Sequence, residues 1–175
     1  GNTFDQAGVA DTFSSALAEL GIESSKMIVK DASGLSKENR VTANLVGQLL
    51  VKIKTDERFV PLINGFPVSG ISGTLRNRFT ETAPDAVGLV KAKTGTLSNT
   101  TNLAGYVESG DREYAFVIIS DRHAKTYSVA NRIRDLVDRI LGKIAAPFLP
   151  SVQPEPVPAS ELEPELEIVS SETPL

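Results

Sequence analysis

The sequence has no cysteine among its 175 residues. The chain can therefore form neither a disulfide framework nor a thiolate metal site, and we expect no metal and no other cofactor. The apolar runs are only a few residues long, far short of the roughly 20 that span a bilayer, so we expect no transmembrane segment in this chain. A chain without cysteine fits an oxidising extracytoplasmic space, although many cytosolic proteins also lack cysteine.

A strong excess of positive charge is also missing. The formal net charge is −4, and six glutamates with no lysine or arginine fall from Pro150 onward. Without those six charges, residues 1–149 carry a net charge of only +2. Nucleic-acid binding requires a clustered basic face, so we expect no nucleic-acid partner.

The two ends of the chain differ from its middle. Residues 1–3, Gly-Asn-Thr, show neither an initiator methionine nor a signal-peptide pattern, so we expect the chain to begin inside a larger polypeptide. Residues 150–175 hold six of the ten prolines and show no apolar period, so they bury too little surface to offset their ordering entropy. We predict one domain over residues 1–149 and an acidic Pro/Glu-rich disordered tail over 150–175. A docking motif is the alternative for the tail.

Apolar spacing predicts two helices in the first third of the chain. Over residues 5–20 apolar side chains recur at helical spacing, and Gly21 stands where a left-handed C-terminal cap belongs. A second helix follows Thr42, which we predict to be its N-cap. The apolar face of that helix comprises Leu45, Val46, Leu49, Leu50 and Ile53.

The segments around these helices are shorter. Residues 27–29, Met-Ile-Val, predict a short strand that ends in a turn. Residues 61–73 are rich in glycine, proline and serine and predict a loop. Ser72 is expected to cap a short helix that continues to Phe79.

After Pro84 the pattern changes from helix to strand. We predict three strands, over residues 87–94, 102–108 and 112–120. Ser109-Gly110-Asp111 predicts a tight hairpin turn, and the nearly continuous apolar run "YAFVIIS" predicts a strand with both faces covered. Residues 128–144 then predict a helix long enough to cover the sheet. The order gives an α+β fold, an antiparallel three-strand meander packed by helices.

The first strand contains the triplet Lys93-Thr94-Gly95. Such a triplet arises by chance, and ordinary strand chemistry accounts for it: a lysine whose amine reaches solvent, a β-forming threonine and a glycine bulge. Its place on a strand that opens an antiparallel meander closed by a long helix is the placement of the Lys-Thr-Gly motif in penicilloyl-serine transferases.

Four segments carry a wider resemblance. They are "DASGLSKENRVT" (31–42), "GFPVSGISGTLRNRF" (65–79), "VKAKTGTL" (90–97) and "NLAGYV" (102–107). In this order and spacing they resemble the class C low-molecular-mass penicillin-binding proteins, the D-alanyl-D-alanine carboxypeptidase/endopeptidases. The likeness runs from about residue 5 to 145. It implies the C-terminal part of a penicillin-binding/β-lactamase-like transpeptidase domain.

The resemblance assigns roles to the triplet and its neighbour. In this family a serine attacks the D-Ala–D-Ala amide and water releases the ester that forms. Lys93, Thr94 and Gly95 are then the expected catalytic residues, with Lys93 as a fixed cation and Gly95 admitting close approach of the substrate. Thr94 and Thr96 are the expected substrate-binding residues: the Thr94 hydroxyl bonds the terminal carboxylate, and the Thr96 N–H is the second oxyanion donor. The peptide would lie along this strand as an added strand.

Two of the family's three motifs do not occur in this chain. No lysine follows a serine by three positions, as Ser-x-x-Lys requires, and no asparagine follows a serine by two, as Ser-x-Asn requires. Ser36 is no nucleophile, because Asn39 stands where the lysine would be. The single histidine, His123, is expected in a solvated loop, since the family does not use histidine as a base.

These observations lead to a primary hypothesis and two alternatives. The chain is a fragment of a serine-type D-Ala-D-Ala carboxypeptidase/endopeptidase that acts outside the cytoplasm on peptidoglycan stem peptides and is inhibited by β-lactams. Its missing partner is the N-terminal half of the same domain. The alternatives are a non-catalytic module that binds peptidoglycan peptides and an unrelated α+β domain with an accidental triplet. A three-strand sheet without that half exposes a long edge, which makes independent folding doubtful.

Overall fold

A computed structural model of the chain describes residues 6–146. Its α-helices are α1 (Gln6–Glu19), α2 (Ala43–Thr55), α3 (Val60–Asn64) and α4 (Tyr127–Ala145). Three short 3-10 helices are η1 (Glu57–Phe59), η2 (Gly73–Leu75) and η3 (Pro84–Ala86). The strands are β1 (Val90–Leu97), β2 (Thr100–Ser109) and β3 (Arg112–Ser120), which form one antiparallel sheet in the order β1-β2-β3. The predicted tail, residues 150–175, lies outside the described residues.

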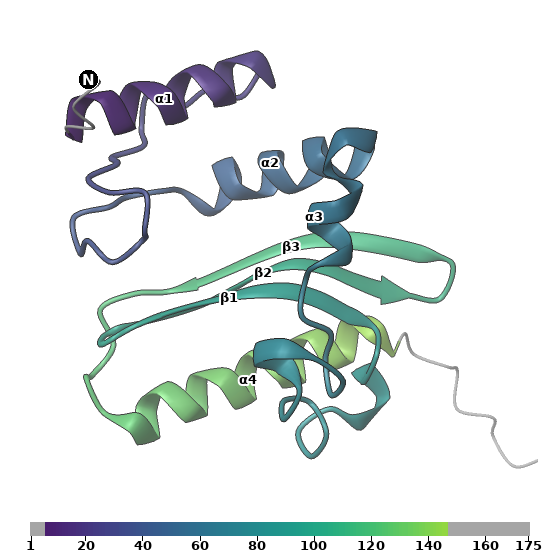
Figure 1. Ribbon diagram of the computed structural model, residues 1–175. Helices are drawn as coiled ribbons and strands as arrows, with labels where there is room; N and C mark the ends of the chain where they lie inside the picture. The colour runs from purple at the N-terminus through teal and green to yellow at the C-terminus, as the bar shows by residue number, and fades with distance from the viewer. Residues whose placement is uncertain (1–5, 147–175) are drawn as a thin grey trace, which may run out of the picture.

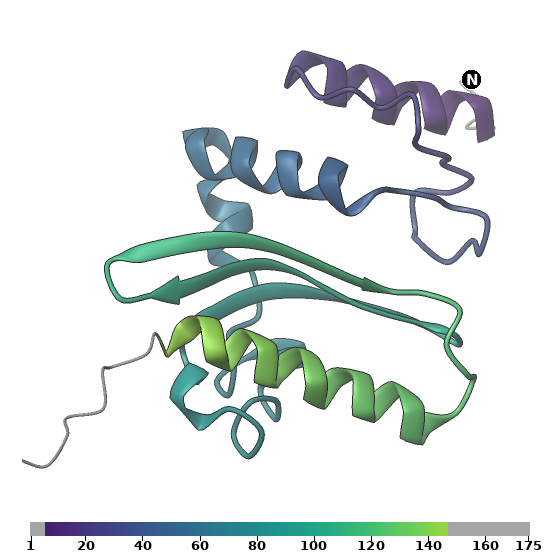
Figure 2. The same ribbon diagram turned by 180° about the vertical axis from the view of Figure 1, so that it is seen from behind.

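The elements stack in layers (Figure 1). Helix α1 lies over α2, α2 lies on one face of the sheet, and α4 covers the opposite face together with the segment between α3 and β1. The view from behind shows the same order (Figure 2). This arrangement confirms the predicted α+β fold with a three-strand meander packed by helices.

Strand alternation divides the core between the two faces of the sheet. Toward α4, a cluster of buried side chains joins the helix to β1 and β2, and it includes Leu75, Phe79, Val90, Leu103 and Leu141. Toward α2, a smaller cluster joins Leu50 and Ile53 to Tyr106. A third cluster, of Leu17, Ile22 and Leu45, holds α1 on α2. The sheet is therefore apolar on both faces along β2, its central strand.

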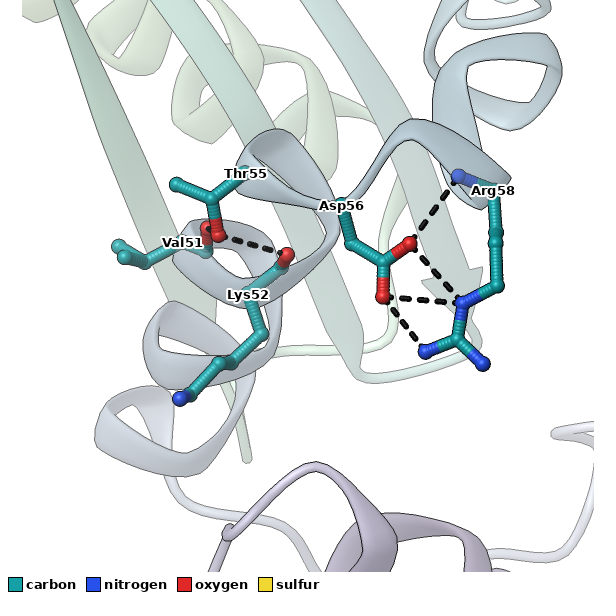
Figure 3. Close-up of polar contacts among 5 residues, drawn as sticks. All are labelled: Val51, Lys52, Thr55, Asp56 and Arg58. Atoms are coloured by element: carbon teal, nitrogen blue, oxygen red, sulfur yellow. Dashed lines mark hydrogen bonds and ion pairs between the residues drawn. The ribbon is translucent and has the colours of Figure 1, made fainter.

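Helix ends follow the predicted caps. The Thr42 hydroxyl accepts a hydrogen bond from Leu45 N at 3.1 Å. Gly21 has φ +71°, and the N–H groups of Gly21 and Ile22 bond to Ala18 O and Leu17 O, both at 2.9 Å, as in a Schellman motif. The end of α2 is closed by side chains (Figure 3): Thr55 Oγ1 donates to carbonyls of the preceding turn, and Asp56 binds the Arg58 guanidinium and N–H.

The segment 65–90 is anchored at two points below the sheet. The Ser69 hydroxyl is fully buried, donating to Ala86 O at 2.6 Å and accepting from Val90 N at 3.1 Å. On α4, the carboxylate of Asp138 is only 2% exposed, forms an ion pair with Arg78 and accepts from Phe79 N at 3.3 Å. Because a buried carboxylate is stable only when paired, Asp138 fixes the end of this segment against α4.

One glycine in the sheet is required by packing. A Cβ at Gly105 would lie 2.1 Å from Lys91 O and 2.6 Å from Ala92 Cα, both backbone atoms of β1. Any side chain there would push β1 away from β2. The glycine of the "NLAGYV" segment therefore sets how closely these two strands approach.

Some predicted elements are wrong in position or extent. Residues 27–29 form no strand, because only Ile28 pairs, in an isolated bridge with Arg40. Residues 61–64 belong to α3 rather than to a loop, since Pro61 sits in the first turn, where its missing N–H costs nothing. Ser72 does not cap η2 with its side chain: its hydroxyl instead accepts from Val68 N at 3.0 Å.

The apolar faces of the last elements also differ from the prediction. Strand β1 begins at Val90, three residues later than predicted, after the left-handed Gly88 at φ +83°. Strand β3 is an edge strand that leaves Tyr114 and Ile119 exposed, so its faces are only partly covered. On α4, Leu136 and Ile140 are exposed, whereas Val137 and Leu141 of the same turns are buried in the cluster with β1 and β2.

Tyr106 joins α2 to the sheet and gives a prediction on pH. Its hydroxyl donates to Leu50 O at 2.7 Å, and burial together with the nearby Glu113 charge raises its pKa to about 12. A pKa raised above the unfolded value of about 10 adds stability that is complete below pH 10 and is lost as the pH rises through 12. We expect the free energy of unfolding to fall by about 1–2 kcal/mol over that range from this residue.

Urea unfolding of the wild type and Tyr106→Phe at several pH values measures this contribution. At pH 7 the variant should lose about 1 kcal/mol with the hydrogen bond. Between pH 10 and 12 the gap should close, because only the wild type has this phenol to ionise. A gap that stays constant up to pH 12 would contradict the raised pKa.

Candidate functional site

The candidate site lies on the outer edge of β1, the edge that faces away from β2. Along the first part of this edge β1 pairs with the loop before it. Ser69 N donates to Val90 O and Ala92 N donates to Pro67 O, both at 2.9 Å. Val90 N donates to the Ser69 hydroxyl at 3.1 Å. The loop thus closes the outer edge as far as Ala92.

Beyond Ala92 the same edge is open. Backbone groups alternate along a strand, and Leu89 O, which accepts from Glu108 N of β2, shows that the odd-numbered residues face β2. The backbone groups of Thr94 and Thr96 therefore face outward, like those of Val90 and Ala92. Among the residues that the structure describes, no loop or strand covers them. Two residues of strand edge are available for an added strand.

The Lys93 ammonium reaches this open edge. Its Nζ donates to Thr94 O at 2.7 Å, and the side chain is exposed. Because Thr94 O faces outward, the positive charge lies at the outer edge rather than over the middle of the sheet. The structure thus brings the predicted cation next to the predicted hydroxyl-bearing residue.

The Thr94 hydroxyl approaches the same edge from the other face of the sheet. Its Oγ1 lies 3.1 Å from Oγ1 of Thr74, which belongs to η2 in the segment 65–79. Thr74 was not identified from the sequence, because its only signal there was membership of the segment 65–79 that contributes to the family resemblance. The contact depends on tertiary folding across 20 residues.

The pairing of β1 with β2 is regular through the triplet. Lys93 pairs with Ala104, Thr94 with Leu103 and Gly95 with Asn102, with no bulge. The bulge considered from the sequence is therefore absent from this strand. Lys93 and Gly95 lie on the face toward α2 and Thr94 on the face toward α4. Their functional groups meet at the outer edge because, within residues 6–146, no strand pairs with β1 on the side away from β2.

Gly95 has no structural reason to be glycine in the described chain. Its φ is not in the left-handed region, and an added Cβ would meet only the Asn102 side chain, at 3.6 Å, an ordinary contact. Gly105 on the paired strand, by contrast, is required by close backbone packing. Space for a side chain at Gly95 exists in this structure, so packing within the described residues does not require glycine there.

Ser36 and His123, which the sequence analysis did not assign to catalysis, make contacts that stabilise local structure. Ser36 N donates to Asp31 Oδ2 at 2.7 Å inside a hydrogen-bonded loop. The bond from Asn39 Nδ2, with backbone N–H groups of the loop, lowers the pKa of Asp31. His123 is half-buried rather than freely solvated: its ring lies 3.1 Å from the Thr101 hydroxyl and 3.0 Å from Ala124 O.

A cavity of about 600 Å³ opens beside the C-terminal end of β1, the strand that carries the Lys-Thr-Gly triplet. It lies between α1, the loop 27–41, α2 and the end of the sheet, and its wall is mainly apolar, with Leu17, Ile28, Leu45, Leu97 and Ile119 among the lining residues. Within residues 6–146, no cluster of three or more acidic, histidine or cysteine side chains is arranged for a metal ion. No helix in that range has the length and hydropathy needed to cross a bilayer.

Comparison with known proteins finds relatives that are named as carboxypeptidases. The profile of the family described as D-Ala-D-Ala carboxypeptidase 3 (S13) matches residues 2–144. The D-alanyl-D-alanine carboxypeptidase of Actinomadura sp. (strain R39) is 39% identical over 114 residues, which are 62% of this chain and 21% of that relative. The D-alanyl-D-alanine carboxypeptidase DacB of Haemophilus influenzae is 36% identical over 104 residues, 59% of this chain and 22% of that relative.

Solved structures show the same fold. Penicillin binding protein 4 (dacB) of Haemophilus influenzae, in complex with a β-lactam, superposes with a TM-score of 0.66 at 29% identity. The match covers 77% of this chain and 32% of that protein. The chain thus spans between about a fifth and a third of the length of these relatives.

The two glycines of the paired strands give a matched prediction. Gly95→Ala should change the free energy of unfolding by no more than about 1 kcal/mol, since its Cβ has room and alanine restricts the unfolded chain. Gly105→Ala should cost more than about 3 kcal/mol, because its Cβ would overlap the β1 backbone. Urea unfolding of both variants measures the difference. Equal losses in the two would show that Gly95 is also fixed by packing.

Proposed function

Because the chain belongs to the D-Ala-D-Ala carboxypeptidase 3 (S13) family, we propose that it forms the carboxylate-binding side of a serine-type D-Ala-D-Ala carboxypeptidase/endopeptidase. The substrate is the stem peptide of peptidoglycan, and the site works outside the cytoplasm, where that polymer lies. The observation that carries the proposal is the open edge of β1. There the Lys93 ammonium, the Thr94 hydroxyl and the outward backbone groups of Thr94 and Thr96 lie close together.

The edge suits a peptide that ends in a free carboxylate. An extended peptide adds to β1 beside Thr94 and Thr96, as in other strand-addition complexes. The Thr94 hydroxyl donates to the terminal carboxylate, and the Lys93 ammonium supplies a positive potential close to it. For this, the Lys93 amine leaves Thr94 O, which the added strand then uses. The absence of a side chain at Gly95 lets the peptide approach the strand closely.

The acyl-transfer step uses one backbone donor of this chain. A serine oxygen attacks the carbonyl carbon of the D-Ala–D-Ala bond, and negative charge develops on the carbonyl oxygen. The outward Thr96 N–H stabilises that oxygen together with the N–H of the attacking serine. The C–N bond then breaks, the terminal D-Ala leaves as an amine after gaining a proton, and water later hydrolyses the ester. A β-lactam follows the first half of this path and stays bound.

The nucleophile and its base are supplied by a companion segment that carries Ser-x-x-Lys and Ser-x-Asn, the N-terminal half of the same domain. Two observations support this. The described chain lacks both motifs and spans only part of its relatives. It also leaves apolar surface uncovered, including the cavity wall at Ile28 and Ile119 and the stripe Leu136, Ile140 and Ile144 on α4. Such contiguous exposed apolar side chains are typical of an interface.

A non-catalytic module that holds peptidoglycan peptides is the second candidate. The absence of Ser-x-x-Lys from this chain favours it. The two candidates share the carboxylate site and differ in the companion segment. An assay for covalent acylation therefore distinguishes the two candidate functions, whereas a binding assay does not.

Labelling with a fluorescent penicillin tests the proposed function. The polypeptide that joins this chain to a Ser-x-x-Lys segment should become covalently labelled, and the 175-residue chain alone should not. Lys93→Ala or Thr94→Val in the longer polypeptide should slow labelling about 100-fold, since each removes a group that stabilises the anionic substrate. Gel fluorescence against time gives the rate.

Lys91→Ala is the matched control for this experiment. Lys91 lies on the same strand and face as Lys93, but its ammonium pairs with Glu108 at 3.0 Å. Its removal should leave the labelling rate within about twofold, since exposed ion pairs contribute little. Labelling of the 175-residue chain alone would mean that the nucleophile lies within it. Equal loss in the Lys91 and Lys93 variants would remove the specific role of Lys93.

A further inference from the structure

We propose that Thr74 is a positioning residue for the carboxylate site, holding the Thr94 hydroxyl in the orientation that donates to the substrate. This inference rests on the proposed function and extends it to a residue outside the Lys-Thr-Gly triplet. In this structure the Thr94 hydroxyl donates to the Thr74 hydroxyl, with the two oxygens 3.1 Å apart. Thr74 comes from η2, and Thr94 comes from β1.

Proton counting sets the direction of the bond in the working site. A hydroxyl has one proton and two acceptor lone pairs. If Thr94 donates its proton to a carboxylate, it has none left for Thr74. Thr74 must then donate to Thr94, which reverses the bond seen in this structure and requires both hydroxyls to rotate about their C–O bonds. A donor behind Thr94 also polarises the Thr94 hydroxyl and strengthens the bond that it gives to the carboxylate.

Thr74 is held in place by the same loop that closes the edge of β1. Pro67 O accepts from Ala92 N, and the Pro67 ring lies against Gly73, whose added Cβ would meet it at 3.0 Å. Leu75, the next residue after Thr74, is fully buried, and its carbonyl accepts from Gly70 N at 3.0 Å. Thr74 therefore stands on a turn fixed on both sides, although its own side chain is exposed.

The chain itself allows a direct test of the orientation. Three-bond NMR couplings from the backbone ¹⁵N and ¹³C′ of Thr94 to its Cγ2 report whether χ1 occupies one rotamer. We expect one rotamer in the wild-type 175-residue chain and in Thr74→Ser, which keeps the hydroxyl. Thr74→Val keeps the volume but not the hydroxyl and should give averaged couplings. Thr55→Val, a hydroxyl deletion at the end of α2 (Figure 3), is the control and should leave Thr94 unchanged.

Penicillin acylation of the longer polypeptide tests the consequence. Thr74→Val should lower the acylation rate constant about 10-fold, and Thr74→Ser should restore it to within about threefold. In a Thr94→Val background, Thr74→Val should have no further effect, because Thr74 acts through Thr94.

Two results would overturn the inference: a single Thr94 rotamer in Thr74→Val, or an additive loss in the double variant. Failure of the wild-type polypeptide to be acylated would instead overturn the proposed function. The couplings measured in the chain would still decide whether Thr74 orients Thr94.

Discussion

The outer edge of β1 is hydrogen-bonded to the preceding loop as far as Ala92 and open from Thr94 onward, and the candidate site depends on this open part. Up to Ala92 the outward N–H groups have partners in the preceding loop, Ser69 Oγ for Val90 and Pro67 O for Ala92. At Thr94 and Thr96 no backbone bond to the loop is formed within residues 6–146, although Thr74 contacts the Thr94 side chain. A strand edge without a partner is ordinarily an aggregation hazard. Here it is short, bordered by a lysine, and placed where an extended peptide can complete the sheet.

Interactions far from the triplet keep the loop in this position. Ser69 is buried among backbone groups of η3 and β1, and Asp138 on α4 binds Arg78 and Phe79 N. Phe79 adopts φ +72°, unusual for a residue with a large side chain, and its ring is almost fully buried. The strained backbone is held by the carboxylate and the core together. The helix that ends the described chain thus helps to define the edge at which the substrate is proposed to bind.

Local patterns in the sequence were sufficient for the order of α1, α2, the three strands and α4, and for the Thr42 cap, the Gly21 cap and the hairpin turn at Gly110. Local patterns did not predict the features that depend on which strands pair and which helix faces pack on the sheet. Residues 27–29 lack a neighbouring strand, and Leu136 and Ile140 point away from the sheet. In the site, the triplet was visible as a motif, but the contact of Thr74 with Thr94 and the packing requirement at Gly105 were not. Each of these depends on which backbone lies beside it, and no spacing rule contains that information.

The central claim is that the outer edge of β1 is open from Thr94 onward. Amide hydrogen exchange of the free 175-residue chain tests it most directly, because the exchange rate of each outward N–H group is measured separately. The account predicts slow exchange at Val90 and Ala92, whose N–H groups are bonded, and fast exchange at Thr94 and Thr96, within about tenfold of the rate in an unstructured peptide. Equal protection at all four amides would show that the edge is closed along its whole length and that no peptide can add to it.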